Sequence, residues 1–279
     1  MVKKYFIVVT FLLVSCSSYE YAHHHEWHGA FDPTENAAQV YGGYSAGCVD
    51  GAVALPDSGA GFTSMNRLGN RYYGHPDLIN FIKKLGKTVE NKYKRQLLIS
   101  DLGHARGGPA DINSSAHRSH QSGLDVDIWF RHMPSYVKVK QDTYPTSTLK
   151  SDKSSISLAG FNSKTAKILK DAASFDEVER ILLNPLIKKE MCERYKGASW
   201  LNKLRPWWGH HKHFHVRLKC PDGNSYCKKQ SPVPESDGCG AQLDWWFSDE
   251  AKDFGKEKSD EKRKYPKLPR QCDAVWKSR

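Results

Sequence analysis

The chain has 279 residues, and its 42 lysine and arginine residues exceed its 31 aspartate and glutamate residues, giving a net charge of +11. A hydrophobic content of 39% is enough for one good-sized globular domain, and no internal repeat is visible. The basic charge favours anionic partners, but nucleic acid is excluded as the expected partner because no basic stripe accompanies a reading helix.

The first 15 residues are typical of an export signal. Lys3 and Lys4 precede an almost wholly apolar run over residues 5–14. This run is too short to span a bilayer, which takes roughly 20 residues. We therefore exclude residues 1–15 from the fold, which leaves 40 basic and 31 acidic residues and a net charge of +9.

The signal ends in Leu-Val-Ser-Cys at residues 13–16, which resembles the lipobox of bacterial lipoproteins. By this resemblance Cys16 is lipidated and becomes the new N-terminus, and Ser17 implies sorting to the outer membrane. The expected location is the periplasm of a Gram-negative bacterium, with Cys16 as the only membrane attachment. The alternative is a periplasmic protein without a lipid, in which Cys16 is incidental.

Residues 16–40 lack an amphipathic period and are predicted to form a flexible tether. This segment contains His23, His24, His25 and His28 without a strand pattern, so a flexible tether is favoured over a metal site. The folded domain is expected over residues 41–248. Residues 249–279 are predicted to be a charged, proline-containing tail, largely irregular up to residue 271 and pinned by Cys272.

Helix and strand signals alternate between these ends without the regular rhythm of a doubly wound fold. Helical spacing predicts helices over residues 76–85 and on past Val89, over residues 163–169 and over residues 176–183. Strands are predicted over residues 96–100, 123–130 and 213–219. The predicted class is α+β, a single domain with a small, largely antiparallel sheet flanked by helices and long loops.

Cysteine usage supports an oxidising compartment. Without Cys16, six cysteines remain, an even number that indicates three disulfides whose connectivity the spacing alone leaves open: Cys48, Cys192, Cys220, Cys227, Cys239 and Cys272. A bridge between Cys220 and Cys227 is sterically reasonable because they flank a Pro-Asp-Gly-Asn turn.

Two stretches, residues 117–127 and residues 207–215, carry most of the chemical information. Because side chains alternate along a strand, His213 and His215 project from one side, as do Asp125 and Asp127. A catalytic zinc ion takes three imidazole or carboxylate ligands and leaves the fourth position to water. The pattern therefore predicts a zinc site, with further histidines available as a base. Surface polar residues or a non-catalytic metal store are the alternatives.

At these residues the sequence resembles the penicillin-insensitive murein endopeptidases, within the wider group of lysostaphin-like, D-Ala-D-Ala-cleaving and hedgehog-like zinc folds. The resemblance rests on the Ser-His-Gln-Ser-Gly-Leu-Asp-Val-Asp-Ile run at residues 119–128 and on His-Phe-His-Val-Arg-Leu at residues 213–218. Residues 70–76 and 206–210 also match, and the resemblance spans Tyr41 to about Phe247.

This resemblance implies one zinc ion per chain, held by His120, Asp127 and His215, with His213 as the catalytic base. His117 and His210 would line the same cleft. It also implies three disulfides, which pair Cys48 with Cys272, Cys192 with Cys239, and Cys220 with Cys227.

The implied substrate is the peptide crosslink of peptidoglycan, the D-alanyl to meso-diaminopimelate amide bond, which a zinc-activated water hydrolyses. The alternative is a non-catalytic zinc-containing peptidoglycan-binding module, and the presence of His213 as a base favours catalysis. A third hypothesis, metal delivery in the periplasm, would depend on the histidines at positions 23–28. The sequence does not fix an oligomeric state.

Overall fold

The computed structural model of the chain describes residues 27–110, 118–260 and 267–278. The predicted signal over residues 1–15, the lipidation candidate Cys16, the histidines at 23–25 and the cleft candidate His117 lie outside the described residues. Within the part of the chain that is described, none of the helices combines the length and the hydropathy needed to span a bilayer.

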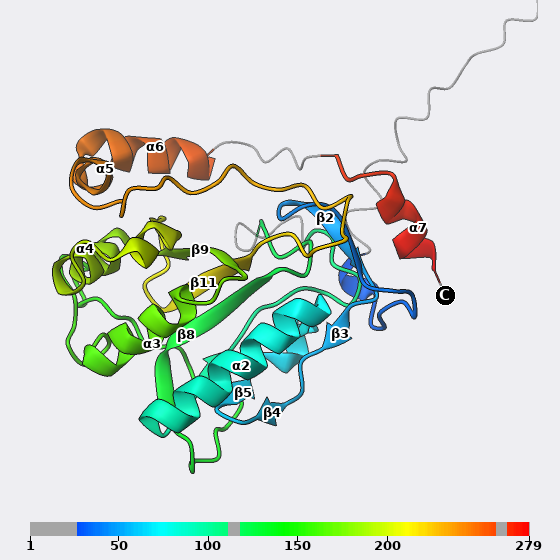
Figure 1. Cartoon of the computed structure of the whole chain (residues 1–279), viewed down its shortest axis with the longest axis horizontal. Helices are drawn as coiled ribbons and strands as arrows, with labels where there is room; N and C mark the ends of the chain where they lie inside the picture. Colours follow the sequence, from blue (N-terminus) through cyan, green and yellow to red (C-terminus); the bar gives the residue numbers. More distant parts are fainter. Residues whose placement is uncertain (1–26, 111–117, 261–266, 279) are drawn as a thin grey trace, which may run out of the picture.

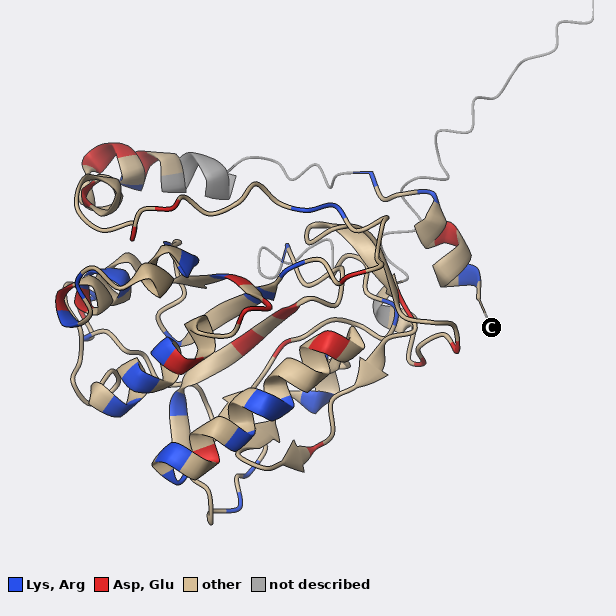
Figure 2. Ribbon diagram, in the orientation of Figure 1, with Lys and Arg blue, Asp and Glu red and all other residues tan. Residues whose placement is uncertain are grey.

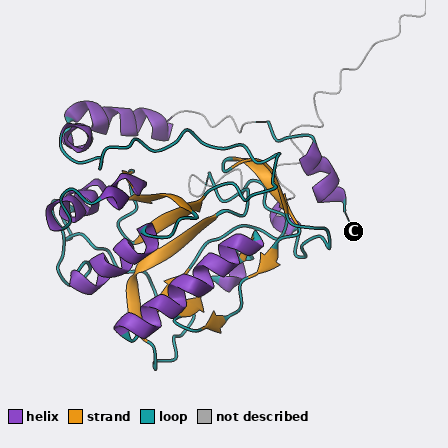
Figure 3. Ribbon diagram, in the orientation of Figure 1, coloured by secondary structure: helices purple, strands orange, loops and turns teal. Residues whose placement is uncertain are grey.

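A mixed sheet of seven strands forms the centre of the molecule, in the order β10-β9-β11-β8-β7-β5-β4 (Figure 3). Its strands are β4 Ser58–Gly59, β5 Phe62–Ser64, β7 Arg95–Ile99, β8 Asp125–Pro134, β9 Val178–Leu183, β10 Leu204–Pro206 and β11 His213–Leu218. Pairing is parallel between β10 and β9 and between β5 and β7, and antiparallel elsewhere. The predicted α+β class with a largely antiparallel sheet is confirmed.

Two small sheets and several helices surround this sheet. β1 Gln39–Gly43 pairs with β2 Ala46–Asp50, and β3 Val53–Ala54 pairs with β6 Tyr73–Gly74. The α-helices are α2 Pro76–Tyr93, α3 Ser163–Ala173, α4 Pro185–Arg194, α5 Ala241–Asp244, α6 Asp249–Asp260 and α7 Gln271–Lys277. The 3-10 helices are η1 Trp27–Gly29, η2 Arg67–Gly69, η3 Ser199–Lys203 and η4 Trp245–Phe247.

The helix predicted from residue 76 is α2, and its start follows from local chemistry. The side chain of His75 accepts a hydrogen bond from the Asp77 amide at 3.2 Å, and Pro76 occupies the first helical position. Leu78, Ile82 and Leu85 are buried on one face of the helix. α2 packs on β5 and β7 and contacts α3, which packs on β8 and β9 (Figure 1).

The two faces of β8 and β11 have different roles. Val126 and Ile128 of β8, with Phe214 and Val216 of β11, belong to the main hydrophobic core together with α2 and α3. The intervening polar residues project to the other face because side chains alternate along a strand. Acidic positions are visible within β8 (Figure 2). The core packing therefore fixes the strands that carry the candidate site.

The helix predicted over residues 176–183 is wrong, since this segment is strand β9. Val178 and Ile181 are both buried at a spacing of three, which mimics a helix. In the sheet this spacing reflects an irregularity in the pairing with β11, where Arg217 is opposite Arg180 but Leu218 is opposite Val178. A bulge of this kind shifts the alternation by one residue.

The ends of the chain are more ordered than their composition predicts. Residues 27–40, expected to be part of the tether, pack on the domain: Trp27 is 2% exposed and belongs to one hydrophobic cluster with Cys48, Cys272 and Val275. Within residues 249–271, expected to be irregular, helix α6 forms, with two acidic residues in its first turn where they suit the helix dipole. Burial of the Trp27 ring orders the first of these segments, and helix signals in the sequence order the second, despite their polar composition.

The structure contains three disulfides among the described residues: Cys48 with Cys272, Cys192 with Cys239, and the local bridge of Cys220 with Cys227. This is the pairing that the resemblance implied. The first joins β2 to α7, and α7 also packs on β2. Three disulfides are typical of proteins that fold outside the reducing cytoplasm.

Candidate metal centre

The pairing of β8 with β11 aligns the first two candidate ligands. His215 lies directly opposite Asp127 in this antiparallel pair, and His213 lies opposite Trp129. Directly opposite residues share a face of the sheet, so the Asp127 carboxylate and the His215 imidazole meet side by side. The Asp127 amide also donates a hydrogen bond to the Asp101 carbonyl at 3.0 Å, which fixes the backbone at this position.

His120 reaches the same point from the turn that precedes β8. Its backbone is in the left-handed region, with φ of 68°, and its amide donates a hydrogen bond to Asp125 Oδ2 at 3.0 Å. Gly123 in the same turn has φ of 69°, and a Cβ at this position would lie 2.9 Å from the His75 amide nitrogen. The turn therefore requires a glycine, and it folds the imidazole back over the strand.

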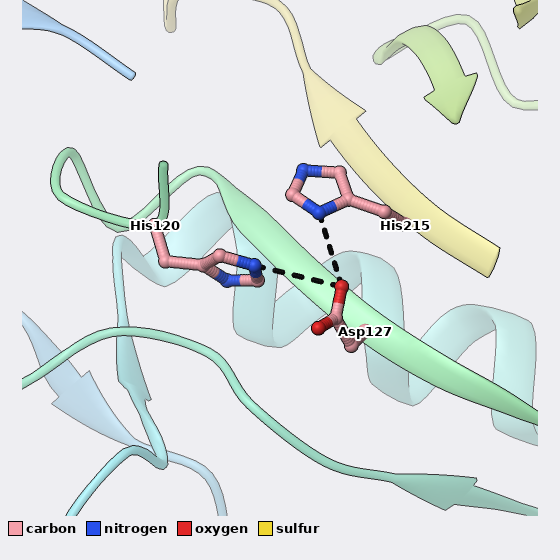
Figure 4. A group of neighbouring side chains, drawn as sticks. All are labelled: His120, Asp127 and His215. Carbon is pink, nitrogen blue, oxygen red and sulfur yellow. Dashed lines mark ion pairs between the residues drawn. The ribbon is translucent and has the colours of Figure 1, made fainter. Parts of the chain in front are cut away.

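His120, Asp127 and His215 form a compact group of donors (Figure 4). Asp127 Oδ1 lies 3.0 Å from His215 Nδ1 and 3.5 Å from His120 Nε2. One ligand atom from each residue lies within 4.8 Å of the others, and all three residues are buried. Two imidazoles and one carboxylate so close together could hold a metal ion.

Asp125 orients His215 within this group. Its carboxylate is fully buried and accepts hydrogen bonds from Arg217 Nε at 2.7 Å and from His215 Nε2 at 3.0 Å. With Nε2 held by Asp125, it is Nδ1 of His215 that faces Asp127. Burial alone would raise the pKa of Asp125, but the charges of Arg217 and His215 hold it well below its usual value. Asp125 is therefore a permanent anion behind the donor group.

Within the donor group, neighbouring charges favour the ionised forms of Asp127 and His215. Burial would raise the pKa of the Asp127 carboxyl, but the neighbouring charges of His213 and His120, with hydrogen bonds from the imidazoles, hold it well below its usual value. Burial would lower the pKa of His215, but Asp125 and Asp127 raise it to about 9. Without a metal, His215 is thus a cation between two carboxylates, and a metal ion would replace its Nδ1 proton.

Two further histidines border the group. His213 Nε2 lies 3.6 Å from Asp127 Oδ2, and its side chain is 28% exposed, so it faces both the donors and solvent. The His210 ring lies 5.0 Å from the His213 ring and 6.0 Å from the His215 ring. Burial, with the charges of His215 and His213, lowers the pKa of His210 to about 4. His210 is therefore neutral at pH 7.

The structure brings together five of the residues singled out from the sequence: His120, Asp127, His210, His213 and His215. The part that Asp125 and Arg217 play behind them was missed. A signal for it exists, because Arg217 follows His215 by two residues just as Asp125 precedes Asp127 by two. Opposite charges at matching strand positions form cross-strand pairs, and Arg217 does lie opposite Asp125.

Comparisons with known proteins point to a single family. A family described as penicillin-insensitive murein endopeptidase matches residues 40–277. Proteins with that name from Klebsiella pneumoniae strain 342 and from Yersinia enterocolitica are each 39% identical to this chain, over 79% of it and over 81% and 80% of their own lengths. The protein of that name from Haemophilus influenzae is 39% identical over 77% of the chain and 76% of its own length.

The match covers both strands of the donor group and the turn that carries His120. It also includes Cys48 and Cys272 near its two ends. The family match covers more than half of the chain, and the relatives are 39% identical to it over more than three quarters of its length. The chain is therefore a peptidase and belongs to the penicillin-insensitive murein endopeptidase family.

Proposed function

We propose that this protein is a zinc-dependent endopeptidase that hydrolyses the peptide crosslinks of peptidoglycan, at the D-alanyl to meso-diaminopimelate amide bond. His120, Asp127 and His215 are the proposed ligands of a single zinc ion, and His213 is the proposed catalytic base. The names of the relatives, murein endopeptidases, support the substrate class. The buried donor group beside a partly exposed histidine supports the chemistry.

The donor set suits zinc. In a tetrahedral site with zinc-to-ligand distances of about 2.0–2.1 Å, neighbouring ligand atoms are about 3.3 Å apart. The separations of Asp127 Oδ1 from His215 Nδ1 and from His120 Nε2, 3.0 and 3.5 Å, bracket this value. Two imidazoles and one carboxylate match the usual ligands of a catalytic zinc ion, and Asp125 supplies the carboxylate that holds the far nitrogen of His215.

When bound, zinc would supply Lewis acidity, which polarises the scissile carbonyl and lowers the pKa of water. The protein supplies the proton transfers. His213 is placed to take a proton from the attacking water, since its imidazole borders the donor group and remains accessible to solvent. The same imidazole then protonates the leaving nitrogen, which would otherwise depart as an unstable anion.

His210 has a different proposed task. Its Nδ1 lies 2.9 Å from the Trp208 carbonyl oxygen, so Nδ1–H is the donor in that hydrogen bond. In the neutral imidazole the other nitrogen then carries no proton and can only accept. We infer that His210 Nε2 accepts a hydrogen bond, from a substrate N–H or from water, and holds the peptide in place beside His213.

The observation that carries this proposal is the convergence of the three donors within 4.8 Å. To test it, the purified protein, loaded with zinc or stripped by a chelator, is incubated with crosslinked muropeptide dimers, and the products are identified by mass. We expect monomers from the zinc-loaded protein alone, with no inhibition by a β-lactam because the mechanism has no serine nucleophile. Binding of the dimers without cleavage would instead support a non-catalytic peptidoglycan-binding module.

We also propose that the protein works in the periplasm of a Gram-negative bacterium, tethered to the outer membrane through a lipid on Cys16. The three disulfides and the bacterial relatives support a location outside the cytoplasm. Labelling of cells with a clickable fatty acid, followed by envelope fractionation, tests the tether. Cys16→Ser should abolish the label and release the protein, whereas an unlabelled wild-type protein in the soluble fraction would contradict the proposal.

A further inference from the structure

A pocket of about 480 Å³ opens beside the donor group of His120, Asp127 and His215. Side chains within residues 147–153 form one wall, and residues 210–213 form the other. His213 lines this pocket and also lies 3.6 Å from Asp127 Oδ2, so the pocket begins at the proposed catalytic base. Its volume lies within the range of small-ligand sites, roughly 300–1,000 Å³.

The wall formed by residues 147–153 is fixed by hydrogen bonds. The amide and the hydroxyl of Thr148 both donate to the His211 carbonyl, each at 2.8 Å, and Thr148 is fully buried. Leu149 forms a bridge with Ile156, and the Lys150 amide donates to the Ser155 carbonyl at 2.9 Å. This hairpin-like loop is therefore anchored directly to the histidine segment, although about 60 residues separate them in the chain.

The pocket is strongly basic. Lys150, Lys153 and Lys212 line it, and none of the other described residues that line it is an aspartate or glutamate. Among the described residues, none of the salt bridges involves these three lysines. The nearby Asp152 caps its own loop, accepting a hydrogen bond from the Ser154 amide at 3.0 Å. Three lysines thus line a space beside the proposed catalytic base, and the one carboxylate on this loop that interacts with them, Asp152 near Lys150, does not line it.

We propose that this pocket binds the carboxylate of the substrate that lies next to the scissile bond, on the leaving-group side. The inference rests on the proposed function, in which His213 hands a proton to the leaving nitrogen, so the pocket that starts at His213 lies on that side. In the proposed crosslink, the carbon that bears the leaving nitrogen also carries a free carboxylate. Ammonium groups on flexible stems suit such a ligand, because they can approach a carboxylate from several directions.

The test uses two crosslinked dimers that differ only at this carboxylate, which is free in one and a carboxamide in the other. The pocket variant is Lys150→Gln/Lys153→Gln/Lys212→Gln. The control variant is Lys83→Gln/Lys87→Gln/Lys167→Gln, which changes the net charge equally at exposed positions of α2 and α3. Hydrolysis is measured as kcat/KM, zinc content by mass spectrometry, and binding of both dimers to metal-free protein by calorimetry.

We expect the wild-type protein and the control variant to cleave and bind the free-acid dimer about tenfold better than the amidated one, the size expected of a few partly exposed charge pairs. The pocket variant should lose this preference and keep its zinc. Equal treatment of the two dimers by the wild-type protein, or equal losses in both variants, would overturn the proposal.

The binding measurement separates this proposal from the proposed function. If neither dimer is cleaved but metal-free wild-type protein binds the free acid better than the pocket variant does, the proposed reaction is wrong and the pocket assignment stands. If cleavage occurs without discrimination at the carboxylate, the reaction stands and the pocket assignment is wrong. A third dimer, amidated at a carboxylate on the other side of the scissile bond, should behave like the free acid.

Discussion

The donor group and the basic pocket meet at His213, yet the chain holds their side chains in different ways. The donor group is buried, and two of its three residues, Asp127 and His215, lie on neighbouring strands whose register the core fixes. The pocket is lined by exposed lysines, two of them on a loop that hydrogen bonds attach to the histidine segment and the third, Lys212, in that segment. Positions that demand sub-ångström placement are thus built on strands, while a charge that acts over a longer range is carried by a loop.

The largest effect is expected from the proposed ligands. His120→Ala, Asp127→Ala or His215→Ala should each lose zinc and activity together, because removing one of three ligands opens the site. Metal content by mass spectrometry and cleavage of muropeptide dimers provide the readouts. His132→Gln, a histidine of β8 outside the donor group, is the matched control and should keep both. Full zinc loading with normal turnover in any of the three would contradict the ligand assignment.

His213 borders both the donor group and the basic pocket, so its substitution tests whether it acts as a base or as a metal ligand. His213→Ala should retain zinc and lose about 10²–10⁴-fold in kcat, because a general base contributes that much to rate without holding the metal. Steady-state kinetics and metal analysis on the same sample give the answer. A folded His213→Ala protein without metal would place this residue among the ligands instead.

Substitution of Asp125 tests how much the stability of the strand region depends on the buried Asp125–Arg217 ion pair. Asp125→Asn should destabilise the fold by about 3–5 kcal/mol, since Arg217 is left buried without its carboxylate. Urea unfolding of the metal-free protein measures this change. In Asp125→Leu/Arg217→Met the unpaired charge is gone, so most of the stability should return. Activity should not return, because His215 has lost the carboxylate that orients it.

Metal affinity should depend on pH, because a metal bound at the proposed site would displace a proton from His215. With its pKa raised to about 9 in the metal-free protein, His215 is protonated below that pH. Lowering the pH from 8 to 6 should therefore weaken zinc binding by up to about tenfold per pH unit, as measured by competition with a chelator. The raised pKa also stabilises the metal-free fold below pH 6.5, and this contribution is lost as the pH rises towards 9.

The smallest effect is expected in the loop. Thr148→Val removes the hydroxyl that donates to the His211 carbonyl but keeps the backbone hydrogen bond. The loss of one such bond costs about 1 kcal/mol, and kcat/KM for the free-acid dimer should fall by a few-fold at most. Zinc content should not change. Loss of zinc in Thr148→Val would show that the loop and the strand region are not independent.

The sequence by itself determined much of this protein's chemistry. Strand patterns at residues 123–130 and 213–219 predicted β8 and β11, and the alternation of side chains put His213 with His215 and Asp125 with Asp127. The helices from residues 76 and 163 followed from apolar spacing. These features depend on neighbours in the chain, so local patterns are sufficient to predict them.

Only the tertiary structure decided how the pieces meet. The register that sets His215 opposite Asp127, and the turn that returns His120 to them, depend on contacts between distant segments. Strand β9 was missed because a bulge against β11 gave its buried residues a helical spacing. The basic pocket was missed because Thr148 and His211 are neighbours only in the folded chain. Each of these features is stabilised by non-local hydrogen bonds or burial, which no short stretch of sequence encodes.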